Sequence, residues 1–331
     1  MKFAAALLAA TATATADVAF ESIGHFKLAN AAFPTVTKFA DSDKFLLCSS
    51  FGALSSGYVY VVPDVADAVK SGDVSGLNSV KLSTPSFEWP NDVQVIPDSV
   101  FGYRAIMVPD GFLVPGKSNG GLYIIKMDDS DITKTVSTTK ISAKKNGYFY
   151  HMGEWVDMNN DGRLDFVTAR SNAKAGGGEL VWFEHPAEGL TDATWTEHVV
   201  TSGPDVGIQV VHVPQYKNEI VVFAAEFFNE KVSFYRVSTK TGELVDSRVI
   251  DTTIGSAYSV TYADLNNDGS MELMVNNHET KDDKDGIWAY SFPSNWMTGT
   301  FTKHTLATGF KNKFSLTVPN MAPGFPYPFY P

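Results

Sequence analysis

Short runs of apolar residues separated by turn residues recur along the whole chain. The runs are rich in β-branched and aromatic side chains, which is typical of β-strands. Six of them resemble one another, and their starts are 57, 60, 56, 50 and 56 residues apart: 34–39, 91–96, 151–158, 207–213, 257–265 and 313–318. Repetition at this period predicts an array of similar β-units.

The first five units continue with further strand-like runs. The second run lies at 44–50, 104–109, 164–170, 219–225 and 271–277, and the third at 57–62, 120–127, 177–186, 231–237 and 286–292. A fourth run closes each unit, and two copies are nearly superimposable: WTEHVV at 195–200 and FTKHTL at 301–306. Four short antiparallel strands per unit predict the blades of a β-propeller. The one helical candidate, 63–72, is interpreted as a short insertion.

The two ends of the chain predict one further, composite blade. Residues 21–36 resemble 303–318, which contain the end of one unit and the start of the next. The residues before 34 would then provide the outer strand of the last blade and 313–318 its inner strand, so that the termini close the ring and remove an open sheet edge. The proline-rich tail at 321–331 cannot make the missing middle strands. We therefore expect an all-β single propeller of six blades, with seven as the alternative.

The N-terminus has the pattern of a secretory signal peptide. Lys2 precedes an apolar stretch at 3–10, and small residues at 14–16 provide a cleavage site. The sequence thus predicts a signal peptide at 1–16, a propeller at 17–331, and a secreted protein or one of the secretory pathway. Cys48 is the only cysteine and lies in an apolar run, which predicts a buried, inert thiol.

The net charge of the chain limits the kinds of molecule that it can be expected to bind. Lys and Arg number 26 against 37 Asp and Glu, giving a net charge of −11. This balance argues against nucleic acid, which is bound by clustered basic side chains. No later segment is long and apolar enough for a membrane helix. The expected partner is a small-molecule substrate, and the oligomeric state is left open.

Two units carry the same aspartate-rich loop between their first and second strands. The pattern D-x-N-x-D-G-x-x-[DE] occurs at 157–165 and at 264–272. Oxygen ligands at alternate positions suit a hard cation such as calcium, and the glycine permits a sharp turn. We predict two structural Ca²⁺ ions, held by Asp157, Asn159, Asp161, Arg163 and Asp165, and by Asp264, Asn266, Asp268, Ser270 and Glu272. A turn that binds nothing is the alternative.

These loops, with GGELVWFEHP at 177–186 and WTEHVV at 195–200, resemble the FG-GAP/VCBS family of β-propellers from about residue 25 onwards. Within it, WPNDV at 89–93, HMGEW at 151–155 and APGFPYPF at 322–329 are similar to secreted fungal members related to the propeller part of aldos-2-ulose dehydratase. That enzyme also has a zinc-binding cupin, which has no counterpart in these residues. The chain is similar in kind and size to secreted fungal propellers that act as hetero-Diels–Alderases in tropolone–sesquiterpenoid pathways.

In a propeller the innermost strands line the channel, so the residues that begin these strands are the candidates for a ligand site. The catalytic candidates are His151, Glu154, Asp92 and Lys313. The candidates for substrate binding are Trp89, Asn91, Tyr150, Trp155, Gln209, Tyr258 and Phe314, and Asp205 lies at a similar position. His151 and Glu154 form the best acid–base pair, since histidine titrates near neutral pH and a carboxylate would fix its tautomer. Ordinary rim residues are the alternative.

Three functions are compatible with such a pocket. The resemblance implies, first, a non-redox enzyme that assists dehydration and a stereocontrolled cycloaddition in secondary metabolism. A sugar lyase or dehydratase is the second, and a non-catalytic lectin or adhesion propeller is the third. No P-loop, dinucleotide fingerprint, zinc signature or G-x-S-x-G elbow occurs, so we expect no organic cofactor.

Overall fold

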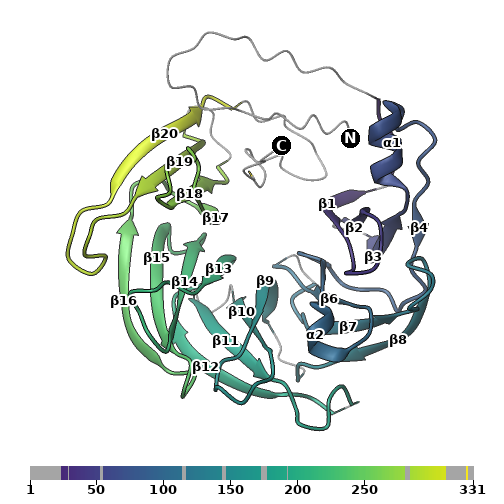
Figure 1. The fold of residues 1–331 in the computed structure, drawn as a ribbon, viewed down its shortest axis with the longest axis horizontal. Coiled ribbons are helices and arrows are strands. Elements are labelled where there is room, and N and C mark those ends of the chain that lie inside the picture. Colours follow the sequence, from purple (N-terminus) through teal and green to yellow (C-terminus); the bar gives the residue numbers. More distant parts are fainter. Residues whose placement is uncertain are drawn as a thin grey trace. The chain divides into compact units, whose positions relative to one another are not determined.

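The computed structural model describes residues 24–28, 30–52, 55–113, 117–143, 147–172, 177–191, 193–279, 284–310 and 326. The chain divides into two compact units. Unit 1 comprises Met1–Asp110 and Leu122–Lys140, and unit 2 comprises Gly111–Gly121 and Ile141–Pro331. Each unit is built from four-stranded antiparallel sheets (Figure 1).

Unit 1 contains two sheets. The first has the order β1 (Ala31–Thr37), β2 (Phe45–Gly52), β3 (Ser55–Val62) and β4 (Val80–Lys81), with helix α1 (Val65–Ser71) between β3 and β4. The second has the order β5 (Gln94–Val95), β6 (Ala105–Pro109), β7 (Leu122–Met127) and β8 (Thr135–Lys140), with helix α2 (Asp98–Phe101) between β5 and β6. Each strand therefore pairs with its neighbour in the sequence, as in a propeller blade.

Unit 2 contains three sheets with the same order. They are formed by β9 (Phe149–Val156), β10 (Asp165–Asn172), β11 (Gly177–Glu184) and β12 (Thr196–Ser202); by β13 (Gly207–Val211), β14 (Glu219–Glu226), β15 (Lys231–Ser238) and β16 (Leu244–Asp251); and by β17 (Ala257–Ala263), β18 (Glu272–Asn277), β19 (Gly286–Ser291) and β20 (Thr302–Thr308). The two similar outer strands occupy equivalent places, since His198 lies opposite Trp182 and His304 opposite Ala289.

The cores lie between successive sheets of a unit. In unit 1, Phe45 and Leu47 of the first sheet pack in one cluster with Val108 and Ile125 of the second. In unit 2, one cluster joins the sheets β9–β12 and β13–β16, and another joins β13–β16 and β17–β20. Because both faces of the middle strands are covered, strands such as β6 and β14 are apolar along nearly their whole length.

The predicted number of blades is wrong. The described residues form five four-stranded sheets, where the sequence predicted six blades with seven as the alternative. Each of the five sequence repeats that have four recognisable apolar runs forms one sheet. The sixth was inferred from two end strands alone, without the middle strands that a four-stranded blade needs. The predicted inner strand at 313–318 lies outside the described residues, as do 1–23, which include the predicted signal peptide.

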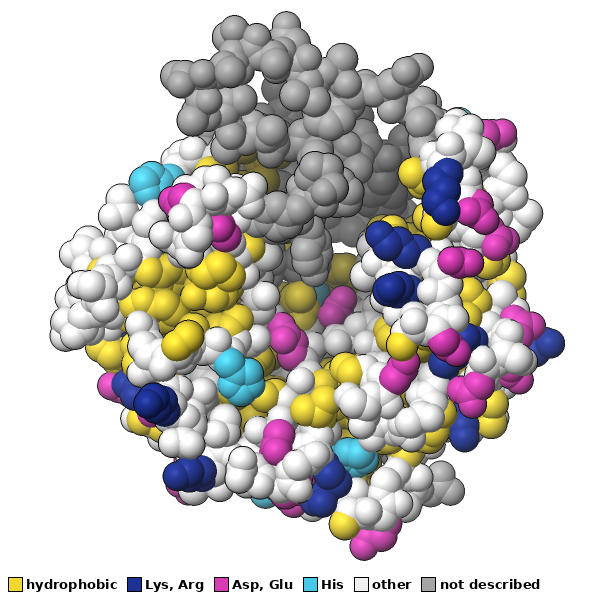
Figure 2. Space-filling model, in the orientation of Figure 1, with side chains coloured by type: hydrophobic (Ala, Val, Ile, Leu, Met, Phe, Trp, Pro, Cys, Tyr) yellow, Lys and Arg dark blue, Asp and Glu magenta, His cyan; other side chains and the backbone are white. Residues whose placement is uncertain are grey.

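Other expectations on the fold are confirmed. Cys48 is 1% exposed, and burial raises the pKa of its thiol to about 11, so the thiol stays protonated. The insertion at 63–72 contains α1. Neither helix in the described part of the chain has the length and apolar character needed to cross a membrane. Lys, Arg, Asp and Glu are interspersed over the face shown in Figure 2.

Candidate functional site

The two aspartate-rich loops connect the first and second strands of their sheets, β9 to β10 and β17 to β18 (Figure 1). Both turn sharply by means of left-handed residues at the same two positions. In the first loop φ is 61° at Asn160 and 85° at Gly162, and in the second it is 58° at Asn267 and 87° at Gly269. Asparagine and glycine adopt this conformation more readily than other residues.

The leading aspartate organises each loop in the same way. The Asp157 carboxylate accepts hydrogen bonds from the N–H groups of Asp161 (3.2 Å) and Gly162 (2.9 Å). The Asp264 carboxylate accepts the corresponding bonds from Asp268 (3.1 Å) and Gly269 (2.9 Å). The asparagine at the third position also accepts from the fifth residue in both loops, at 3.1 and 3.0 Å. The repeated sequence pattern thus corresponds to a repeated conformation.

The ninth position closes each loop onto its second residue. Asp165 accepts a hydrogen bond from the Met158 N–H at 2.9 Å, and Glu272 accepts one from the Leu265 N–H at 3.0 Å. The other Asp165 oxygen accepts from the His185 N–H at 2.8 Å. Asp165 is fully buried, and this burial raises the pKa of its carboxyl to about 6.

The seventh position distinguishes the two loops. Arg163 forms an ion pair with Asp161 inside the first loop and donates from Nε to the His185 carbonyl at 3.0 Å. The second loop has the uncharged Ser270 at this position. The backbone bond is the same in both loops, from the Arg163 N–H to Asp161 at 2.9 Å and from the Ser270 N–H to Asp268 at 2.7 Å. The first loop therefore contains a cationic side chain of its own, whereas the second does not.

The donors of both loops are carboxylate, amide and carbonyl oxygens, which suit calcium or magnesium better than softer metals. A carboxylate oxygen has two acceptor sites, and Oδ1 of Asp157 accepts from the N–H groups of both Asn159 (3.3 Å) and Asp161 (3.2 Å). Among the residues that the structure describes, no group of three or more His, Cys, Asp or Glu side chains is gathered as a metal site. The donor types fit calcium, and its binding stays a prediction.

A second cluster lies at the first strands of unit 2. The Tyr258 ring of β17 lies 4.3 Å from the His278 ring and 5.8 Å from the His151 ring of β9, centroid to centroid. Phe227, which follows β14, approaches the same tyrosine at 6.2 Å. Three sheets of unit 2 thus contribute to what we call the Tyr258 cluster: His151, Phe227, Tyr258 and His278. His151 is 3% exposed, whereas the other three are half-buried.

Burial sets the protonation state of His151. Removal from solvent, with a smaller contribution from His278, lowers the pKa of His151 to about 3. The sequence predicted a histidine that titrates near neutral pH, whereas the buried position lowers the pKa of His151 far below that range. At neutral pH the His151 imidazole is uncharged, so that one ring nitrogen can donate a hydrogen bond and the other can accept one.

Asp205 fixes the Phe227 side of the cluster. Its carboxylate is fully buried and accepts hydrogen bonds from the N–H groups of Phe227 (2.6 Å) and Phe228 (2.8 Å). Burial, with Glu226 as a further cause, raises the pKa of Asp205 to about 7 against the lowering effect of these bonds. Asp205 therefore holds the turn that carries Phe227.

The remaining candidates of unit 2 have varied surroundings. Tyr150 is buried 6.0 Å from the Phe183 ring, and Trp155 packs at 5.1 Å from Phe166. Gln209 accepts a hydrogen bond from the Tyr262 N–H at 2.5 Å, which joins β13 to β17. Glu154 lies on β9 with His151 and is half-buried. Lys313 and Phe314 lie outside the described residues.

The candidates of unit 1 lie together before β5. The Trp89 ring packs at 4.4 Å from Phe51, and the backbone N–H of Trp89 donates to the buried Asp110 carboxylate at 2.6 Å. Asn91 is buried, and its N–H donates to the Pro109 carbonyl at 2.9 Å. Burial raises the pKa of Asp92 to about 6, with a hydrogen bond from Gln94 at 3.2 Å acting in the opposite direction.

Sequence reasoning missed two members of the Tyr258 cluster, His278 and Phe227. Each follows the second strand of its sheet, β14 or β18. The candidates from the sequence were taken from the first strands alone. The usable signal was the run of polar and aromatic residues that follows β18 and β14, NNHE at 276–279 and EFFN at 226–229.

Comparison with known proteins adds little to these findings. No protein-family model matches the chain, and no curated protein matches it. Thirty-five chains of solved structures match, among them one described as "Structure of Dos1 propeller". That match has 12% sequence identity and a TM-score of 0.46, and it covers 86% of this chain and 60% of that chain. The chain thus spans less than two thirds of that structure's length, and the FG-GAP/VCBS family stays a prediction from the sequence.

Proposed function

We propose that this chain is a small-molecule enzyme that works without redox chemistry, with its ligand site at the Tyr258 cluster. The observation that carries the proposal is the position of the half-buried Tyr258 ring, with an imidazole 4.3 Å away on one side and another at 5.8 Å. Aromatic faces bind flat rings, and imidazoles add a few directed polar groups, which is the usual composition of a small-molecule pocket.

The chemistry proposed is dehydration of a phenol-like or tropolone alcohol followed by cycloaddition. The substrate loses its ring O–H proton and its side-chain hydroxyl group together as one water. This leaves an o-quinone methide, which forms one C–O bond and one C–C bond with an alkene. No oxidant or reductant is consumed. Orientation of the two partners in a pocket supplies much of the acceleration in such a reaction.

The neutral state of His151 suits this step. Because burial holds the pKa of His151 at about 3, its imidazole is neutral and would act on the substrate as a hydrogen-bond donor or acceptor, while the ring O–H proton leaves with the side-chain hydroxyl group as water. Tyr258 and Phe227 would hold the flat intermediate, and His278 offers a second polar contact. Asp205 would act indirectly, by positioning Phe227.

We also propose that the two aspartate-rich loops bind calcium in a structural role. Each loop joins the first and second strands of a sheet in unit 2, so a cation there would tie the two strands together. The residues that would hold it are the oxygen-bearing residues of the two loops, headed by Asp157 and Asp264, whose carboxylates already accept the N–H groups of the turn. Bound calcium would neutralise the carboxylates of each loop.

The enzymatic proposal is tested with purified full-length protein, a hydroxymethyl tropolone and an electron-rich alkene, followed by chiral chromatography. We expect faster product formation with one stereoisomer in excess, and loss of about tenfold or more in rate for Tyr258→Ala. Tyr103→Ala, which removes a half-buried tyrosine of unit 1, serves as the control and keeps the wild-type rate.

Two outcomes would contradict the proposal. An unchanged rate and a racemic product with wild-type protein would exclude the cycloaddition. Turnover of a keto-sugar in the same assay, or glycan binding without turnover of any substrate, would favour a sugar dehydratase or a lectin instead.

A further inference from the structure

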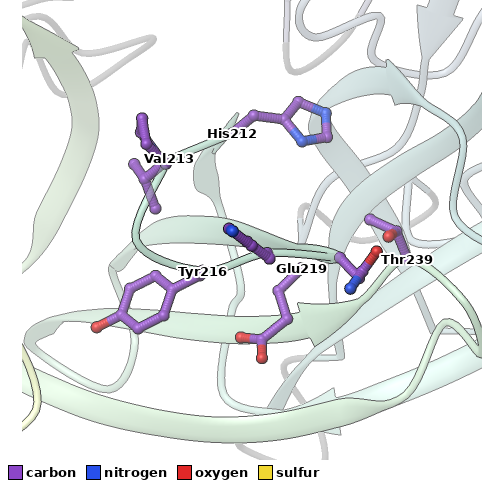
Figure 3. A pocket seen from close by; sticks show the side chains of 8 residues that line it. His212, Val213, Tyr216, Glu219 and Thr239 are labelled. Atoms are coloured by element: carbon purple, nitrogen blue, oxygen red, sulfur yellow. The ribbon is translucent and has the colours of Figure 1, made fainter.

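The third loop between first and second strands in unit 2, from β13 to β14, borders a hollow of about 280 Å³ (Figure 3). Its wall combines the apolar Val213, Pro214 and Tyr216 with the polar His212, Lys217 and Glu219. The loop lies at the position that the aspartate-rich loops occupy in the two neighbouring sheets of the unit. It has no aspartate, and its composition is basic and aromatic instead.

The loop is held in a defined shape. Val213 is buried in the core between the sheets, and the Tyr216 N–H donates to its carbonyl at 3.0 Å. Asn218 is left-handed with φ 60°, and its carbonyl accepts from the Thr239 N–H at 3.0 Å. The hollow is therefore formed by an ordered turn and needs little rearrangement to accept a ligand.

The only carboxylate that lines the hollow is already neutralised. Both oxygens of Glu219 accept from Arg236, Nε at 2.8 Å and Nη2 at 3.0 Å. The same guanidinium lies 4.2 Å from the centroid of the Tyr216 ring. Arg236 thus cancels the negative charge of Glu219 and covers the tyrosine.

The remaining polar side chains are free to meet a ligand. In the described part of the chain, neither Lys217 nor His212 has a hydrogen-bond or ion-pair partner, and both are exposed. Lys217 brings a positive charge with three donors, and the imidazole brings at least one N–H donor. On a protein with a net charge of −11, Lys217, Glu219 and the Arg236 that pairs with Glu219 together carry a net charge of +1 at this hollow.

We propose that the hollow beside the loop from β13 to β14 binds a small organic anion that carries a carboxylate on a flat ring. Lys217 and His212 would hold the carboxylate, while the exposed Pro214 and the exposed part of Tyr216 would contact the ring. The volume of about 280 Å³ admits a ligand of this size. This site is separate from the Tyr258 cluster and does not depend on the proposed enzymatic function.

The test uses two-dimensional NMR of the full chain titrated with benzoate. Benzylammonium, which has the same ring and the opposite charge, is the matched ligand control. We expect benzoate to shift resonances of 212–219 with millimolar affinity, and benzylammonium to leave them unchanged. Lys217→Met should weaken benzoate binding about tenfold, because it removes a charge-assisted hydrogen bond.

Lys240→Met is the control variant, because Lys240 is exposed and does not line the hollow. It should bind benzoate like the wild type, and both variants should keep the wild-type spectrum elsewhere. The proposal is overturned if benzoate does not shift the loop, if benzylammonium shifts it equally, or if the two lysine variants weaken binding to the same extent.

Discussion

At the scale of single residues, burial decides the chemistry of the candidate site. Asp205 has no exposed surface, and the pKa of its carboxyl is raised from 3.8 to about 7. Glu226 is also fully buried and accepts from the Tyr235 hydroxyl at 2.7 Å, while Lys231 lies 3.2 Å from its other oxygen. Because this cluster holds two buried carboxylates and one lysine, its protonation changes with pH, and so does its contribution to the stability of the fold.

The first prediction concerns Asp205→Asn. A folded-state pKa above the unfolded one means that the stability from this group is complete below pH 4 and is lost as the pH rises through 7. The wild type should therefore lose up to about 4 kcal/mol more than the variant between pH 4 and pH 8. Chemical denaturation at a series of pH values measures this difference. Parallel curves for the two proteins would show that Asp205 does not titrate in this range.

A second prediction concerns the turn glycine of the second aspartate-rich loop. Gly269 has φ 87°, and no atom lies within 4 Å of a Cβ added there, so Gly269→Ala introduces backbone strain without a clash. We expect a loss of about 1–2 kcal/mol in the free energy of unfolding, measured in the absence of calcium.

Gly76→Ala provides the matched control. Gly76 also has open space around an added Cβ but lacks a positive φ. This variant should be neutral or slightly stabilising. An equal loss in both variants would exclude backbone strain as the cause.

At the scale of elements, the predicted calcium loops are the most specific feature. Loop 264–272 has no cationic side chain, whereas Arg163 pairs with Asp161 in loop 157–165. A lysine or arginine in a loop competes with a bound cation for the same carboxylates. We therefore expect calcium to stabilise the second loop more than the first.

Thermal unfolding with calcium and with a chelator tests this difference. Calcium should raise the Tm of the wild type, Asp268→Asn should remove most of that gain, and Asp161→Asn should remove less. Asp246→Asn, on the exposed face of β16, should keep the whole gain. A Tm that does not respond to calcium, or an equal loss in all three variants, would contradict the calcium proposal.

The elements also show where sequence reasoning succeeds. The aspartate-rich loops could be located because all their oxygens come from nine consecutive residues. The second and third strands were recognisable because both faces of strands such as β14 and β15 are largely buried. First strands were harder to delimit, since only Gln94 and Val95 of the run 91–96 form a strand.

The Tyr258 cluster could be predicted only in part. His151 and Tyr258 were found because each lies on a first strand. The contacts of Tyr258 with His151 and Phe227 join different repeats, and the contact with His278 joins two strands of one repeat. No local sequence pattern gives the distance between such residues. The pKa of His151 likewise depends on how deeply the folded chain covers it.

At the scale of the whole molecule, the sequence repeat predicted the make-up of each sheet correctly but the number of sheets incorrectly. Each of the five sequence repeats with four apolar runs forms a four-stranded antiparallel sheet. The error came from counting the chain ends as a sixth unit, although similarity of two single strands does not supply the hydrogen-bonding partners that a sheet needs. Within unit 1 and within unit 2, apolar clusters pack between successive sheets. This packing holds the first strands and their loops in place.

The most direct test of the account is a crystal structure of the full chain soaked with a hydroxytropolone and calcium. We predict a ligand ring in van der Waals contact with Tyr258 and within hydrogen-bonding distance of His151 or His278. A ring bound elsewhere, with the Tyr258 cluster unchanged, would contradict the proposed site.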